Sequence, residues 1–379
     1  MQKEFGHYED DRAMSIVQIF ERRKGFVWSE KALSVLFDIA VNHKSPEKGK
    51  ANITPQEDKE ILLVDSIERN AINSVRSEAL RAIAELIWDD DKMAERFWEP
   101  IKQAVSDANP VMRYASQFAL WPIYNIDRKW ASEQVLSLYE NDVRMAGFHD
   151  GKGMLIRLYA DYRRKIIDIV HQMFVSEDKR LIKTAGYTIA ELYLQHDEFK
   201  EIVMGKFGFT KEQKEAVLEM LIVYVGEEEY REKAKAALIY NVEDSFDIES
   251  PWTRLFYDKL VNLNTDGEFI NIILSSVIGR RVLGTFLHFA EETDGGLKNY
   301  ANLILRICKN LVGIDTERNG VLWLYQENIS KMVISLYDAY SDGLEVDSDI
   351  ALQCLDLWDI MYEKQIGMAR ELTKKMMDM

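Results

Sequence analysis

Asn73-Ser74-Val75-Arg76-Ser77-Glu78-Ala79 opens an apolar, alanine-rich stretch with the periodicity of a helix that packs against other helices. A similar opening recurs at Asn109-Pro110-Val111-Met112-Arg113-Tyr114-Ala115 and, in shortened form, at Asn141-Asp142-Val143-Arg144-Met145-Ala146. A looser copy runs from Asp178 to Ala185, and the alanines of successive copies are 36, 31 and 39 residues apart. Because a helix pair that repeats at such a spacing is typical of α-solenoids, we predict an all-α, right-handed α-solenoid of stacked antiparallel helix pairs.

The residue types in these repeats fit the packing of stacked helices. Small residues are expected where inner helices touch, and apolar partners such as Leu80, Ile83 and Phe118 are expected to fill the space between them. The small residues are Ala79, Ala82, Ala115, Ala119, Ala185 and Ala190. An arginine early in each inner helix is expected to reach an acidic side chain or a turn carbonyl of the neighbouring repeat. Ligand binding is the alternative role for these arginines, which are Arg76, Arg113 and Arg144.

Helical patterns cover nearly the whole chain, and none of the breaks between them is long enough to be a linker. We therefore predict one solenoid over residues 1–379, with the clearest repeats within 73–195 and degenerate repeats at 196–379. Pro122 predicts a kink or an early stop in the helix at 110–124. The other helices are predicted at 10–24, 28–43, 56–71, 74–88, 91–106, 128–139, 161–175, 179–194, 197–206, 210–225, 228–240, 251–263, 268–278, 280–292, 295–312, 321–342 and 347–376.

The composition restricts the class of partner. The net charge of -16 and the isoelectric point near 5.0 argue against a general binder of nucleic acids or anionic membranes, which needs a surplus of basic residues. The residues from Met1 to Gly6 contain no apolar signal segment, and no run of 18 apolar residues occurs anywhere. Two cysteines, Cys308 and Cys354, suit a reducing compartment. The sequence thus predicts a cytoplasmic protein without a membrane segment.

Patterns typical of catalysis are missing from the sequence. The six histidines have no spacing that would hold a metal ion, and we expect His171 and His288 to be hydrogen-bonded core residues. Gly151-Lys152-Gly153 resembles part of a phosphate-binding loop, but the glycine spacing, the hydroxyl residue and the preceding strand that such a loop needs are absent. We therefore predict a protein that is not an enzyme, with no catalytic residues, no cofactor and no metal site.

One segment differs in charge from the rest of the chain. Nine basic and five acidic residues lie between Arg144 and Lys183, which gives this segment a net charge of about +4. Internal ion pairs with neighbouring acidic repeats would explain it, and so would a docking patch for an acidic partner. The same segment contains the shortened third copy and the glycines Gly147, Gly151 and Gly153, which indicate an irregular repeat. Such a repeat is either a surface loop over a degenerate unit or a surface shaped for a partner.

The candidate partner-binding residues come from this segment and from nearby aromatic residues. Tryptophan, tyrosine and arginine are typical anchors of protein interfaces. The aromatic residues Trp88, Trp98, Trp121, Tyr124 and Trp130 lie in or next to adjacent repeats, and we expect most of them to be in the core. The hypothesis is that a basic cluster, with Trp121 or Trp130 nearby, contacts an acidic or aromatic surface of a partner. The basic residues are Arg157, Arg163, Arg164 and Lys165.

Asn73 to Leu86, followed by Val105 to Asp127, is HEAT-like and resembles the C-terminal repeats of large bacterial STAND-type NTPases linked to antiphage defence. In those proteins a similar Asn-x-Val-Arg helix precedes a Pro-Val-x-Arg helix that ends in an Asn-x-Asp turn, here Asn125-Ile126-Asp127. The segments Trp28 to Pro46 and Ile350 to Leu372 also resemble that region. The chain departs from the family because it begins at Met1 without an ATPase module, a phosphate loop or an effector domain. It is expected to be either an excised sensor region or a free-standing protein without the motor.

The resemblance implies a function in recognition. In the family the repeat region senses a ligand, often a foreign protein, and controls oligomerisation, and no individual binding residue carries over to this chain. We therefore expect a non-catalytic protein-recognition solenoid, a sensor or scaffold in bacterial antiphage defence. A phage protein and an NTPase or nuclease subunit are the candidate partners. The alternatives are a general HEAT-repeat scaffold for host proteins and a HEAT-like DNA-repair glycosylase, which the net charge disfavours.

Overall fold

The computed structural model describes residues 10–46, 63–205, 208–245, 247–293, 297–313, 323–341 and 348–364, together with Ile366 and Ala369. Within these residues the chain is all-helical, with eighteen α-helices, three short 3-10 helices and no strand. The α-helices are α2 (Asp10–Arg22), α3 (Glu30–Asn42), α4 (Val64–Ile72), α5 (Val75–Asp89), α6 (Met93–Val105), α7 (Pro110–Ile126), α8 (Arg128–Asn141), α9 (Gly151–Phe174), α10 (Lys179–His196), α11 (Lys200–Val203), α12 (Lys211–Val225), α13 (Arg231–Asn241), α14 (Glu249–Tyr257), α15 (Gly267–Ser275), α16 (Gly279–Glu292), α17 (Ala301–Gly313), α18 (Trp323–Ser341) and α19 (Ser348–Glu363). The 3-10 helices are η1 (Val143–Gly147), η2 (Glu243–Ser245) and η3 (Leu297–Tyr300).

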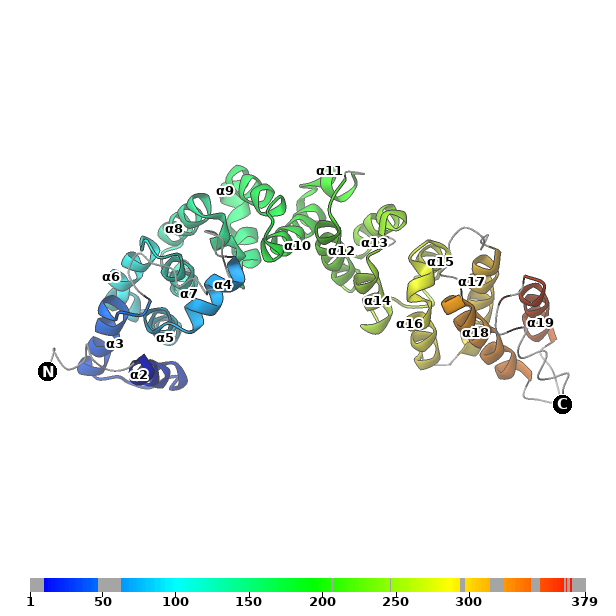
Figure 1. Ribbon diagram of the computed structural model, residues 1–379, viewed down its shortest axis with the longest axis horizontal. Helices are drawn as coiled ribbons and strands as arrows, with labels where there is room; N and C mark the ends of the chain where they lie inside the picture. Colours follow the sequence, from blue (N-terminus) through cyan, green and yellow to red (C-terminus); the bar gives the residue numbers. More distant parts are fainter. Residues whose placement is uncertain are drawn as a thin grey trace. The chain divides into compact units, whose positions relative to one another are not determined.

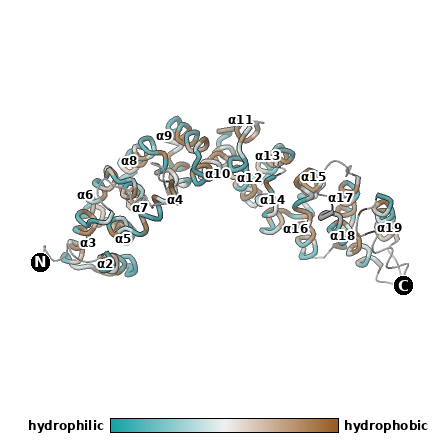
Figure 2. Tube along the Cα trace, in the orientation of Figure 1, coloured by the Kyte–Doolittle hydropathy of each residue, from teal (hydrophilic) through white to brown (hydrophobic). Residues whose placement is uncertain are grey.

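The prediction of an all-α protein is confirmed for these residues. The beginning of the helix predicted at 56–71 and the end of the one predicted at 347–376 lie outside the residues that the structure describes. Figure 2 shows apolar and hydrophilic residues alternating along the helices, as amphipathic helices that pack on their neighbours require. No helix among the described residues is both long enough and apolar enough to cross a membrane.

The chain divides into two compact units, residues 1–188 (unit 1) and residues 189–379 (unit 2), with the boundary inside α10. In unit 1, α5 packs on α7, and α6 and α8 pack on this pair (Figure 1). Ala79, Ala82, Ala115 and Ala119 are fully buried on α5 and α7. Their burial agrees with the expectation that small residues lie where α5 and α7 pack on each other.

An arginine near the start of α5 and another near the start of α7 each contact the turn that precedes the next copy of the sequence pattern. Arg76 is buried, and its guanidinium lies 2.9 Å from the carboxylate of Asp107 and donates to the Ala40 carbonyl at 3.2 Å. Arg113 makes the corresponding ion pair one repeat later, 3.0 Å from Asp142. The predicted contact with an acidic side chain of the neighbouring repeat is therefore confirmed for Arg76 and Arg113.

Arg144 forms an ion pair within its own repeat. Its guanidinium lies 2.7 Å from Asp142, only two residues earlier in the sequence. Partial burial acts to raise the pKa of Asp142, but the hydrogen bonds and charges of Arg144 and Arg113 outweigh it and hold this pKa below its usual value. Asp142 thus accepts hydrogen bonds from both Arg113 and Arg144. Together with the pair of Arg76 and Asp107, these contacts form a ladder of ion pairs along unit 1.

Unit 2 contains an ion-pair cluster of the same kind, which the sequence did not reveal. Arg231 of α13 lies 2.5 Å from the carboxylate of Asp266, next to the start of α15, and donates to the Val225 carbonyl at 2.6 Å. Lys235 lies 3.0 Å from the other oxygen of Asp266, whose side chain is almost completely buried. Arg231 follows a tyrosine rather than a valine, so the sequence pattern that identified Arg76 did not find it.

Two expectations for helices of unit 1 are wrong, the early stop at Pro122 and the start of the helix predicted at 161–175. Pro122 does not stop its helix, because α7 continues to Ile126 around the fully buried Leu120 and Ile123. The helix predicted at 161–175 begins at Gly151, and its two halves meet at the non-helical residue Tyr162. Burial of apolar side chains from 154 onwards outweighs the weak helix propensity of the glycines.

The glycines of this segment allow close backbone approach. A Cβ atom at Gly151 would lie 2.1 Å from the carbonyl oxygen of Ala146, and one at Gly147 would lie 2.8 Å from the Val64 side chain. Gly147 therefore permits α4 to pack directly on η1. This contact matters for the site described next, because it positions α4 beside α7.

Candidate functional site

The predicted partner-binding residues lie on three helices of unit 1. Arg157, Arg163, Arg164 and Lys165 are exposed on α9, while Trp121 of α7 and Trp130 of α8 are partly buried. The structure brings two of the six together: the guanidinium carbon of Arg157 lies 4.5 Å from the centroid of the Trp121 ring. Stacking of this kind is a favourable cation–π arrangement.

The other four predicted residues lie elsewhere. Trp130 packs against Trp98 of α6, with ring centroids 4.5 Å apart. Lys165 pairs with Glu140 of α8 at 2.7 Å. Arg163, Arg164 and Lys165 follow the break at Tyr162, so they belong to a different helical segment from Arg157.

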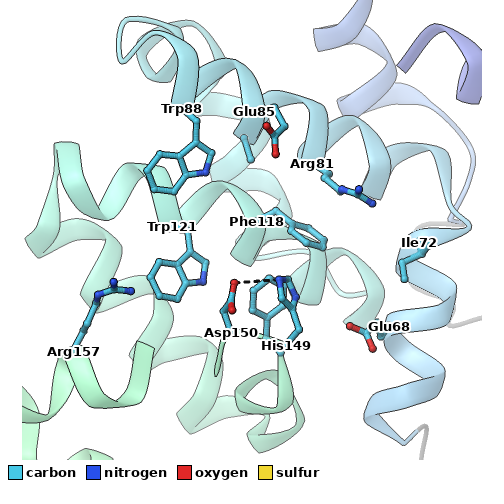
Figure 3. A pocket seen from close by; sticks show the side chains of 12 residues that line it. Glu68, Ile72, Arg81, Glu85, Trp88, Phe118, Trp121, His149, Asp150 and Arg157 are labelled. Carbon is cyan, nitrogen blue, oxygen red and sulfur yellow. Dashed lines mark ion pairs between the residues drawn. The ribbon is translucent and has the colours of Figure 1, made fainter. Parts of the chain in front are cut away.

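Arg157 and Trp121 line a concave surface with a volume of about 640 Å³ (Figure 3). Its apolar part includes two side chains that are half exposed, Trp88 (53%) and Ile72 (48%). Figure 3 shows Trp88 and Trp121 next to each other, with Arg157 beside Trp121 and Glu68 and Ile72 on the opposite side. The lining residues come from α4 (Glu68, Ile72), α5 (Arg81, Ala84, Glu85, Trp88), α7 (Phe118, Trp121), the segment after η1 (Phe148, His149, Asp150) and α9 (Arg157).

A second concave surface continues the first towards α2. It has a volume of about 520 Å³ and shares Ile72 and Arg81 with its neighbour. Its other lining residues are Met14, Gln18, Glu21, Arg22, Asn73 and Glu78. The two surfaces together are called the groove below, and all of its residues belong to unit 1.

Polar contacts over long sequence distances hold α4 in place as one side of the groove. The Val64 amide donates to the carboxylate of Asp178 at 2.8 Å, and Tyr114 donates to Glu68 at 2.7 Å. Arg180 contacts both Glu68 and Asp65. Partial burial acts to raise the pKa of Glu68, but the hydrogen bonds from Arg180 and Tyr114 outweigh it and lower this pKa. Glu68 is therefore ionised at neutral pH and anchors α4.

The carboxylates around Trp88 and Trp121 also have cationic or hydrogen-bonding partners. Glu85 lies 3.0 Å from Lys24, and Asp150 lies 3.2 Å from the imidazole of His149. At the α2 end of the groove, Arg81 lies 2.5 Å from Glu21 and 3.6 Å from Glu78. Burial raises the pKa of Glu78, because the nearby charge of Arg81 opposes this effect only in part.

Arg157 is the exception among the charged residues at this end of the groove. It is exposed, it stacks on Trp121, and no carboxylate of the described residues forms an ion pair with it. The groove thus offers apolar contacts, several anchored carboxylates and one guanidinium whose hydrogen-bond donors are available to a ligand.

The histidines do not form a metal site within the part of the chain that the structure describes, where no group of three or more His, Cys, Asp or Glu side chains could hold a metal ion. The prediction that His171 and His288 are core residues is wrong, because both are exposed on their helices. His288 lies 3.3 Å from Glu292, one helical turn later. Each of these histidines lies on the solvent-exposed side of an amphipathic helix. Their apolar neighbours in the sequence had suggested a buried position, but those neighbours lie on the other side of the helix.

Trp88 is the residue of this site that sequence reasoning could not single out. It was one of several aromatic residues near the repeats, and only the structure separates the groove pair from the Trp98–Trp130 pair on α6 and α8. One signal was available: Trp88 and Trp121 are 33 residues apart, close to the spacing of the repeats, and both lie in the second halves of their helices, α5 and α7.

No protein-family model matches the chain, and no curated protein matches it. The feature of the molecule that indicates a function is the surface of unit 1, where the half-exposed Trp88, the partly buried Trp121 and Arg157 line one concavity.

Proposed function

We propose that the chain is a non-catalytic protein-recognition module, in which the groove of unit 1 binds an extended segment of a partner protein. The observation that carries this proposal is the exposure of Trp88 beside Trp121 and Arg157 in a concave surface. In the free protein, half of the Trp88 side chain is exposed to water, which is unfavourable for an apolar group. A partner that covers this exposed surface therefore stabilises the complex.

The residue types of the groove support protein binding over small-molecule catalysis. Tryptophan and arginine dominate the binding energy of protein interfaces when they lie in a pocket that the partner shields from water. Trp88, Trp121 and Arg157 have this arrangement on α5, α7 and α9. The volumes of about 640 and 520 Å³ are each sufficient for several side chains of a peptide.

The shape of the groove fits an extended segment. Its two parts share Ile72 and Arg81, so a bound chain can run from α9, past α4 and α5, to α2. The contacts of Glu68 with Arg180 and Tyr114 keep α4 in position before a partner arrives. Such preorganisation reduces the entropy that binding must overcome.

The proposed architecture is a right-handed, HEAT/armadillo-like α-solenoid of stacked antiparallel helix pairs. The repeated ion pairs support it, since Arg76 and Arg113 each connect one helix pair to the next and Arg231 makes a similar connection in unit 2. Solenoids commonly bind partners on the surface formed by successive inner helices, and α5 and α7 supply Trp88 and Trp121 here.

The proposed biological setting is a cytoplasmic sensor or scaffold in bacterial antiphage defence. It is supported by the resemblance of Asn73 to Leu86 and of Val105 to Asp127 to the sensor repeats of STAND-type NTPases. The partner in that setting is a phage protein or an NTPase or nuclease subunit.

Replacing Trp88 by alanine is expected to weaken binding of a groove peptide by roughly thirtyfold, as for an interface anchor worth about 2 kcal/mol. Peptides are selected from a random library displayed on yeast, with the full chain as bait, and their affinities are measured with labelled synthetic peptides by fluorescence anisotropy. Trp88→Ala should leave the melting temperature nearly unchanged, because the side chain is half exposed.

Tyr257→Ala is the matched control, since Tyr257 is an aromatic residue of unit 2 that is 76% exposed. It should not change the affinity of any selected peptide. If no selected peptide distinguishes Trp88→Ala from the unmodified chain, the groove is not the recognition surface.

A further inference from the structure

The electrostatics of the groove indicate which charge a partner must carry next to the two tryptophans. The three carboxylates at this end already have partners: Glu68 contacts Arg180, Glu85 contacts Lys24, and Asp150 contacts His149. A cationic side chain of a partner would have to compete with these contacts. Arg157 has no ion-pair partner among the described residues, so an anionic side chain meets an available charge.

The stacking of Arg157 on Trp121 also suits the recognition of a carboxylate. The guanidinium carbon lies 4.5 Å from the centroid of the indole ring, and Arg157 is exposed and has no ion-pair partner among the described residues, so its N–H groups are available to a ligand. These N–H groups form a planar fork that matches the two oxygens of a carboxylate. Because the stack restricts the long side chain before binding, less conformational entropy is lost when the ion pair forms.

The apolar surface beside this guanidinium adds a second requirement. Trp88 and Trp121 come from the neighbouring helices α5 and α7 and lie next to each other, with Arg157 beside Trp121 (Figure 3). A partner whose carboxylate reaches Arg157 therefore places its neighbouring side chain over exposed indole surface. An aromatic side chain gains most from such a contact, since aromatic pairs contribute about 0.5–1.5 kcal/mol beyond the area they bury.

A nucleic acid or another polyanion fits this site less well. Such ligands need several basic residues in a row, whereas the lining of this end of the groove includes Glu68, Glu85 and Asp150. The net charge of the chain, -16, further opposes the approach of a polyanion. A protein segment with a single carboxylate needs only one basic residue, and the negative net charge of the chain repels it less than it repels a polyanion.

We infer that the groove recognises an acidic–aromatic motif, in which an Asp or Glu side chain of the partner pairs with Arg157 and an adjoining aromatic side chain covers Trp88 and Trp121. This inference rests on the proposed function, because it names the chemistry of the segment that the groove binds. In this proposal Arg157 selects an acidic side chain of the partner, and Trp88 provides the apolar contact.

A double-mutant cycle tests the ion pair. The probes are the synthetic peptides selected with the full chain, together with versions in which each Asp or Glu is replaced by Asn or Gln. We expect one such replacement to weaken binding by roughly tenfold, which corresponds to about 1.4 kcal/mol. Arg157→Gln should weaken binding of the parent peptide equally, and the two changes together should cause no further loss.

Two other variants separate the role of the stack from that of the charge. Arg164→Gln removes an exposed arginine that lies beyond the break at Tyr162 and does not line the groove, and it should leave the affinity unchanged. Arg157→Lys keeps the charge but loses the planar fork, so it should bind with intermediate affinity. The melting temperatures of Arg157→Gln, Arg157→Lys and Arg164→Gln should match that of the unmodified chain, because both arginine side chains are exposed.

The inference is overturned if Arg157→Gln binds every selected peptide normally, or if its effect simply adds to that of each acid-to-amide replacement. Peptides that lose affinity for Trp88→Ala but not for Arg157→Gln would overturn the carboxylate motif and leave the proposed groove function intact. If no selected peptide depends on Trp88, the proposed function fails together with this inference.

Discussion

Replacing Arg76 by alanine is expected to lower the free energy of unfolding by about 3–5 kcal/mol, the range found when one partner of a buried ion pair is removed. Arg76 is 2% exposed, and its partner Asp107 lies 2.9 Å away with a side chain that is 10% exposed. Without the guanidinium, the Asp107 carboxylate is left nearly buried without its cation, and the Ala40 carbonyl loses a donor. Urea unfolding followed by far-UV circular dichroism measures the change.

Two controls show whether burial of the pair causes this loss. Arg128 and Asp161 form an ion pair at 2.7 Å whose side chains are both more than half exposed. Arg128→Ala should therefore lower the free energy of unfolding by no more than about 1 kcal/mol. The double variant Arg76→Ala, Asp107→Ala should be more stable than Arg76→Ala alone, since it leaves no buried carboxylate without a cationic partner. Equal effects of Arg76→Ala and Arg128→Ala would contradict the proposed ladder.

Replacing Gly151 by alanine is expected to lower the free energy of unfolding by about 3 kcal/mol, the upper part of the usual range for overpacking. The added Cβ would lie 2.1 Å from the carbonyl oxygen of Ala146, which belongs to the backbone and cannot move as a flexible side chain could. The start of α9 would have to shift away from η1. Thermal and urea unfolding of the purified variant measure the loss.

Gly153→Ala is the matched control for this substitution. Its Cβ would meet only the Trp121 ring, at 3.5 Å, which is ordinary contact. Because alanine favours a helix over glycine by roughly 0.5–1 kcal/mol, this variant should be unchanged or slightly more stable. A result in which Gly151→Ala is as stable as Gly153→Ala would show that η1 and α9 do not meet as closely as described.

The sequence predicted the local features of unit 1 well. The helices expected at 74–88 and 110–124 are α5, at Val75–Asp89, and α7, at Pro110–Ile126. Helix periodicity and start signals such as the Asn109 cap act within a few residues, so they can be read from the sequence. The ladder of Arg76 and Arg113 was predictable for a similar reason, because a repeated packing arrangement leaves the same residue at each copy.

The position of α4 could not be predicted in the same way. Its contacts join residues far apart in the sequence, such as Val64 with Asp178 and Glu68 with Arg180. Neither end of such a contact carries a local pattern that identifies its partner. The groove depends on α4, which supplies Glu68 and Ile72, so its full outline required the three-dimensional structure.

The candidate site was predicted in part. Arg157 and Trp121 were chosen from the charge of the segment and the nearby aromatic residues, and the structure places them in contact. Trp130 was an equal candidate in the sequence but packs on Trp98. Helix periodicity shows that a residue lies on one face of a helix, but it does not reveal which faces a neighbouring helix covers.

The central claim is that partner segments bind beside Trp88 and Trp121. The most direct measurement is the NMR spectrum of the indole N–H groups of the eight tryptophans, recorded while a selected peptide is added. We expect the signals of Trp88 and Trp121 to shift with the peptide concentration, and those of Trp98, Trp130 and the fully buried Trp252 to stay in place. Shifts confined to Trp98 and Trp130, with Trp88 and Trp121 unchanged, would contradict the claim.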